Sequence, residues 1–168
     1  MPHETSGAHE HEDRVSFTDD KVILLVSTSK SDGKEVDSSW TTEWNAVTSI
    51  GGLMYRPNAG IFRFPLRIGG KHDVGYEQLR PRVTAAENSI TGSVKVIGWE
   101  TVEVPAGKFR AIRIEVESTA RPSDGSRAYP RDLAYWYVPE VRRWVKYQGT
   151  TPRNKFGSEL LEYKLNEN

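Results

Sequence analysis

The chain of 168 residues contains no cysteine. This excludes disulfides, zinc–thiolate sites, iron–sulfur clusters and thiol nucleophiles together. It also lacks an excess of charge of either sign, because 23 Lys and Arg residues balance 23 Asp and Glu residues. A chain with no net charge has no long-range attraction for nucleic acid or for an anionic membrane, so neither is expected as a partner.

Long apolar runs are missing as well. The longest, Val22 to Val26, has the length of a strand, and no window approaches the roughly 18 apolar residues of a transmembrane segment. The opening residues MPHETSGAHEHEDR have no apolar core and so are no signal peptide. Two locations stay open: the cytoplasm, or the periplasm or exterior if a signal was removed and Met1 is not the native start.

Catalytic motifs are scarce too. No Gly-x-Ser-x-Gly elbow is present, the Gly-Gly pairs lack the spacing of a phosphate-binding loop, and His72 is the only histidine beyond residue 11. The alternating His and Glu of residues 9–12 could hold a divalent ion, but a mobile tail would have to be ordered to do so. We therefore expect no catalytic residues, no metal site and no cofactor.

The pattern of short β-type runs and turn signals indicates one β-rich domain. Residues 1–13 are polar and predict a flexible tail, whereas residues 14–168 contain short β-type runs with turn signals every 8–12 residues or so. Three strands are expected at the C-terminal end, around residues 133–138, 142–148 and 158–165. The pattern predicts a mostly-β fold, an antiparallel curved sheet or half-barrel, with room for one short helix at residues 81–89.

The clearest hairpin covers residues 99–117, WETVEVPAGKFRAIRIEVE. Pro105 and Gly107 are typical of a three-residue loop with a bulge, in which Val104 opposes Lys108. This register pairs Trp99 with Arg113 in a cation–π contact of about 0.5–1 kcal/mol. It also places six apolar side chains on one core face: Val94, Val96, Val102, Ile112, Ile114 and Val116.

Aromatic residues are the other conspicuous feature. The segment YWYVPEVRRWVKYQ, residues 135–148, mixes aromatic with basic side chains, and Tyr135 and Tyr137 should share one strand face while Trp136 takes the other. Core packing explains most of this pattern. Four tryptophans are nevertheless candidate ligand-binding residues, because they could line a groove or stack on sugars: Trp40, Trp44, Trp136 and Trp144.

Four phrases in order, RFPLRIGG, VIGWETVEVPAGKFRAIRIEVE, AYWYVPEVRRWVKYQ and SELLEYKL, resemble a family of uncharacterised exported bacterial proteins. The resemblance spans residues 61–165. Lys108 stands where that family often has Thr, and Gln148 where it often has Glu. The resemblance implies an antiparallel sheet curved like the half-barrels of periplasmic lipoprotein carriers, and export, often as a lipoprotein. It brings no catalytic residues, and the chain has no lipobox cysteine.

Three functions follow as hypotheses. The first is a non-enzymatic periplasmic or secreted domain that binds a hydrophobic ligand, such as an apolar small molecule, or an envelope protein. The second is a glycan-binding or carbohydrate-active domain that uses the four tryptophans. The third is a structural assembly module whose edge strands pair with a neighbour. The sequence leaves the oligomeric state open.

Overall fold

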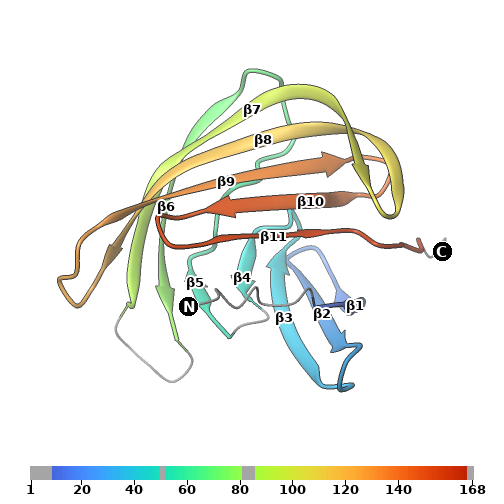
Figure 1. Cartoon of the computed structure of the whole chain (residues 1–168), viewed down its shortest axis with the longest axis horizontal. Helices are drawn as coiled ribbons and strands as arrows, with labels where there is room; N and C mark the ends of the chain where they lie inside the picture. The colour runs from blue at the N-terminus through green and yellow to red at the C-terminus, as the bar shows by residue number, and fades with distance from the viewer. Residues whose placement is uncertain (1–8, 50–51, 81–85, 166–168) are drawn as a thin grey trace, which may run out of the picture.

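The computed structural model of the chain describes residues 9–49, 52–80 and 86–165, and all their regular elements are β-strands. They form one antiparallel sheet in chain order (Figure 1). The strands are β1 (His11–Thr18), β2 (Val22–Ser29), β3 (Glu35–Thr41), β4 (Ala46–Thr48), β5 (Met54–Arg56), β6 (Lys71–Leu79), β7 (Asn88–Val104), β8 (Gly107–Pro122), β9 (Tyr129–Val138), β10 (Arg143–Thr150) and β11 (Lys155–Glu159). The sheet is curved, and no ladder joins β11 to β1 within the described ranges. The predicted mostly-β, antiparallel curved sheet is confirmed.

The helical turn allowed at residues 81–89 falls largely outside the described residues, since 81–85 are not among them and β7 starts at Asn88. The predicted tail, residues 1–13, overlaps the first strand: β1 begins at His11, which pairs with Ser29 of β2. Residues 1–8 lie outside the described part. The described residues include no helix that could cross a membrane.

The hairpin β7–β8 is formed as predicted, but its register is shifted. Val104 pairs with Gly107 rather than with Lys108, so the connection has two residues instead of three. Trp99 pairs with Ile112, and the guanidinium over its ring, 5.3 Å from the centroid, belongs to Arg110. The predicted pair of Trp99 with Arg113 is therefore wrong, because the shorter loop moves each partner by one residue.

A bulge in β7 explains a second difference. The register changes between Val96 and Gly98, so side chains beyond Ile97 alternate in the opposite sense. All six predicted core residues are buried, but Val102 packs in a separate cluster with Val104, Phe109 and Ala111. The concave side of the sheet, the inner face, is thus buried along most of its length. The convex side, the outer face, is buried only near the β7–β8 turn.

Side chains of strand β9 belong to both clusters, the inner one and the outer one. Tyr135 and Tyr137 pack on the inner face and Trp136 and Val138 on the outer, so both predicted sets are buried to a large extent. The outer cluster is covered by residues 160–165. Leu160 donates its N–H to the Val145 carbonyl and accepts from the Ala106 N–H. The strand expected over residues 158–165 instead ends at Glu159.

Candidate functional site

Three of the four predicted tryptophans meet on the inner face. Trp40 comes from β3, Trp44 from the following turn and Trp144 from β10; their ring centroids lie 5.3–6.2 Å apart. Trp40 donates its indole N–H to the Ser38 hydroxyl, and Trp44 donates to the Arg142 carbonyl. These rings pack against one another as part of the core.

Trp136 lies apart from this group, on the outer face. Its indole N–H donates to the Glu100 carboxylate, and the cations of Arg113 and Lys146 lie 5.3 and 5.2 Å from its ring centroid. The separation follows from strand geometry, because Trp136 and Tyr135 are successive residues of β9 and point to opposite faces. The four tryptophans do not form one platform.

The middle of the inner face is filled by the chain itself. The loop 57–70 between β5 and β6 inserts Phe62, which is 1% exposed and stacks on Trp144 at 5.5 Å with an interplanar angle of 6°. Asn45 holds the loop with two hydrogen bonds: its amide donates to the Phe62 carbonyl, and its side-chain oxygen accepts from the Phe62 N–H. His72, considered for catalysis, lies 2.9 Å through its Nε2 from the Gly60 carbonyl of the same loop.

Among the described residues, one end of the inner face forms an open recess. A recess of about 470 Å³ is lined mainly by polar side chains from the ends of β5, β6, β7 and β9. Its lining residues are Leu53, Tyr55, Gln78, Arg80, Glu87, Asn88, Tyr129 and Arg131. A volume of this size lies within the usual range for small-molecule sites, about 300–1,000 Å³.

Arg131 has unusual surroundings in this recess. One of its guanidinium nitrogens donates to the Tyr76 hydroxyl at 2.9 Å, and its carbon lies 6.0 Å from the centroid of the Phe156 ring. The described residues place no carboxylate in an ion pair with it. Arg80, at the same recess, is by contrast bound by Glu87 in a two-pronged pair at 2.9 and 3.0 Å.

Burial shifts the pKa values of Arg131 and of the tyrosines Tyr76 and Tyr135 near it. Burial raises the pKa of Tyr76 and of Tyr135, against the opposing effect of the nearby charge of Arg131. Burial also disfavours the charged form of Arg131 and so lowers its pKa. The neighbouring tyrosines outweigh this effect, so the pKa of Arg131 is raised overall. At neutral pH the hydroxyls are therefore neutral donors and acceptors, and Arg131 is a cation without a counter-charge among the described residues.

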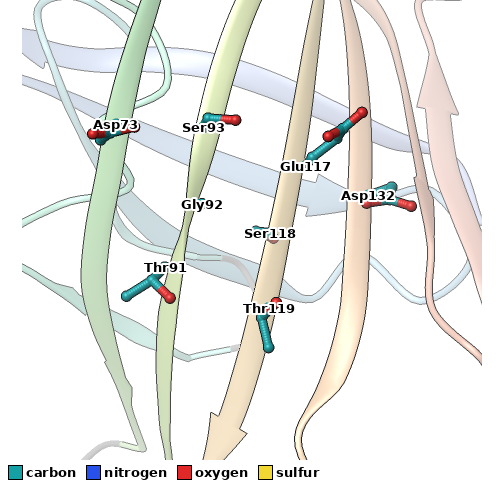
Figure 2. A pocket seen from close by; sticks show the side chains of 8 residues that line it. All are labelled: Asp73, Thr91, Gly92, Ser93, Glu117, Ser118, Thr119 and Asp132. Carbon is teal, nitrogen blue, oxygen red and sulfur yellow. The ribbon is translucent and has the colours of Figure 1, made fainter.

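A second, shallow recess of about 420 Å³ lies on the outer face (Figure 2). Asp73, Ser93, Glu117 and Asp132 are successive register partners across β6, β7, β8 and β9. Figure 2 shows them in a row over neighbouring strands. Within the described ranges, no group of three or more His, Asp or Glu side chains has a geometry that could hold a metal ion. Asp73 also faces away from His72, since the two are adjacent in β6.

Sequence reasoning missed the inner recess. Its signal is a charged residue in an otherwise apolar strand face, because Arg131 alternates with Tyr129, Leu133 and Tyr135 along β9. Such a residue is easily taken for a solvent-exposed position. The recess needs the curvature of the sheet to bring β5 and β6 beside β9, and no local pattern reveals that.

The fold is shared with known proteins. No protein-family model and no curated protein matches the sequence. Two crystal structures are similar at 14% identity, each covering 90% of this chain and 84% of its own. One is a candidate lipoprotein from Parabacteroides distasonis (TM-score 0.53), and the other a candidate exported protein with a YmcC-like fold from Bacteroides fragilis (TM-score 0.52). At this identity the similarity establishes the fold alone.

Proposed function

We propose that the chain is a non-enzymatic, periplasmic or secreted β domain that binds a small ligand in the recess at the open end of its inner face. Export is supported by the exported-protein phrases in the sequence and by the descriptions of the two structures that share the fold. The recess has the volume of a ligand site and contains polar groups that converge from four strands.

The observation that carries this proposal is the filling of the rest of the inner face. A carrier that encloses an apolar ligand needs a cavity lined by apolar side chains. Here Phe62 and Trp144 are in stacked contact where such a cavity would lie, and the loop is anchored through Asn45. A ligand is therefore expected at the rim, where polar groups face solvent, and not within the curve of the sheet.

The glycan alternative is less well supported by the same geometry. A sugar platform needs an open aromatic face, whereas Trp40, Trp44 and Trp144 cover one another and Trp136 is flanked by two cations. Binding is favoured over catalysis because His72 contacts a backbone carbonyl and Asp73 lies on the other face. A nucleophile–base pair would require side chains within hydrogen-bond reach of each other.

Native mass spectrometry of the full chain, purified from the envelope fraction of its own organism, tests the proposal. We expect a small bound mass that is lost when Asn88→Trp fills the recess. Thr91→Trp is the matched control, because Thr91 lines the outer recess instead. The proposal fails if no small mass is retained, if Thr91→Trp releases it as completely, or if only a protein partner is recovered.

A further inference from the structure

The charge of Arg131 is not balanced by an ion pair with any carboxylate among the described residues. Arg131 is partly buried, and a guanidinium that loses part of its water without an anionic partner loses free energy in proportion to that desolvation. Within the described part of the chain its recorded partners are the Tyr76 hydroxyl and the Phe156 ring, which carry no charge at neutral pH. The guanidinium therefore keeps unused donors in a neutral environment at the base of an open recess.

The remaining lining groups do not neutralise it. Glu87 is the one carboxylate among the lining residues, and both of its oxygens are bound by Arg80. The described lining residues thus carry two cations and one anion. Asn88 and Gln78 contribute amides close to the rim, and Asn88 donates to the Gln78 oxygen at 3.4 Å. Amide N–H groups and tyrosine hydroxyls add neutral donors to the charged one.

Two contacts orient the Arg131 side chain, one with Tyr76 and one with Phe156. The Tyr76 hydroxyl accepts from it, which leaves the hydroxyl proton free to donate elsewhere. Phe156 lies over Gly149, where an added Cβ would come within 2.2 Å of its ring, so the glycine leaves room for this ring beside the guanidinium. A donor set that is held in place before binding loses little entropy when a ligand arrives.

We propose that this recess binds an oxyanion, the carboxylate or phosphate group of the ligand, through the Arg131 guanidinium and the neutral donors around it. Guanidinium groups bind both anions in a two-pronged geometry with charge-assisted hydrogen bonds. This inference rests on the proposed function, whose ligand it describes chemically. The source of the anion is either a free small molecule or a lipid head group at a membrane surface.

The test uses the purified full chain and simple anions. Arginine Nε–Hε resonances are followed by NMR while inorganic phosphate or acetate is added at constant ionic strength, with chloride as reference. We expect a saturable shift of the Arg131 resonance with phosphate or acetate and none with chloride. Arg131→Lys identifies the resonance by its loss.

Charge variants provide the decisive comparison. Asn88→Asp places a carboxylate at the recess without altering Arg131, and we expect it to weaken anion affinity about tenfold or more. Asn154→Asp makes the same change in the exposed turn before β11 and should leave the affinity unaltered. An absent or non-saturable Arg131 shift in the parent chain overturns the inference, as does equal affinity in the two variants.

Vesicles separate the two sources of the anion. Co-sedimentation with phosphatidylglycerol vesicles but not with phosphatidylcholine vesicles, lost in Asn88→Asp, assigns the anion to a head group. Saturable binding of free phosphate or acetate without such co-sedimentation assigns it to a small molecule. If native mass spectrometry finds a ligand released by Asn88→Trp but no anion shifts Arg131, the binding function stands and the oxyanion inference falls.

Discussion

The inner and outer faces of the sheet carry recesses of opposite charge, although β6, β7 and β9 contribute to both. The contrast is sharpest at two successive residues of β9, because Arg131 points into the inner recess and Asp132 into the outer one. Arg131 is hydrogen-bonded to Tyr76 and lies over the ring of Phe156. The carboxylates of Asp73, Glu117 and Asp132 project from exposed residues, where solvent screens them.

This difference teaches that charge alone does not make a site. Both recesses have similar volumes, about 470 and 420 Å³. Only the inner one is backed by a continuous core, which fixes its donors and lowers the local dielectric, so an ion bound there interacts more strongly. The outer face is covered near the β7–β8 turn by Leu160 and Tyr163, whereas the three carboxylates of the acidic row are exposed in the described part of the chain. The two faces should therefore respond differently to matched substitutions.

The largest effect is expected from removing a core aromatic ring on each face. Phe62→Ala should lower the free energy of unfolding by about 3–5 kcal/mol, because the ring is 1% exposed and contacts Trp144, Tyr135 and Tyr137. Phe109→Ala on the outer face should cost less, since Tyr163, whose ring centroid lies 6.0 Å from that of Phe109, is itself exposed and can collapse into the space. Urea denaturation measures both; an equal or larger loss for Phe109→Ala would contradict the comparison.

A matched pair of glycines gives the next effect. A Cβ at Gly92, on the inner face of β7, would lie 2.2 Å from the Glu117 carbonyl oxygen and 2.7 Å from the Ser118 Cα, so the β7–β8 backbones would have to separate. Gly92→Ala should destabilise the protein by roughly 1–3 kcal/mol. Gly75 faces outward with no atom within 4 Å of such a Cβ, and Gly75→Ala should change stability by less than about 0.5 kcal/mol. Similar melting curves for the two variants would show that the strands do not approach so closely at Gly92.

Several features of this arrangement could be read from the sequence. Strand alternation identified six of the buried side chains of β7 and β8, five of them on the correct face, and it placed Tyr135 opposite in direction to Trp136. These are local properties, since each depends on the period of two along one strand. The turn residues Pro105 and Gly107 likewise located the hairpin correctly.

The register and the face switch could not be predicted. Pro105–Gly107 is compatible with two loop lengths, and the one-residue difference changes every partner. The bulge at Ile97 has no glycine or proline of its own to signal it, although Gly98 follows. The recess around Arg131 depends on strands that are distant in sequence, and no local pattern shows that the loop 57–70 fills the inner face.

A smaller effect on stability is expected from the ion pair that joins β1 to β10. Asp13 of β1 lies 3.7 Å from the Arg143 guanidinium of β10, which also covers the rings of Trp44 and Trp144 at 5.2 and 5.0 Å. Burial lowers the pKa of Arg143, and Asp13 counteracts this, so removing the carboxylate leaves a largely desolvated cation without compensation. Asp13→Asn should cost about 1–2 kcal/mol, discounted for partial exposure of both side chains.

The control for this variant is Asp37→Asn, which removes the same charge from an exposed position of β3. It should leave the unfolding free energy within about 0.5 kcal/mol of the parent chain. The measurement is chemical denaturation followed by tryptophan fluorescence, because Trp44 and Trp144 report on the contact directly. Equal behaviour of the two variants would mean that β1 is held to β10 by packing and not by this ion pair.

The smallest effect is expected at Trp99, an exposed residue of the inner face near the turn of the β7–β8 hairpin. Beyond the bulge, Trp99 has the orientation of Ile112 but is 46% exposed, and Arg110 lies over its ring. A double-mutant cycle with Trp99→Leu and Arg110→Gln should give a coupling of about 0.5–1 kcal/mol. The same cycle with Arg113→Gln should give none, because Arg113 is engaged by Glu100, Glu115 and Trp136 on the other face. Coupling to Arg113 instead would indicate the register of the three-residue loop, in which Trp99 pairs with Arg113.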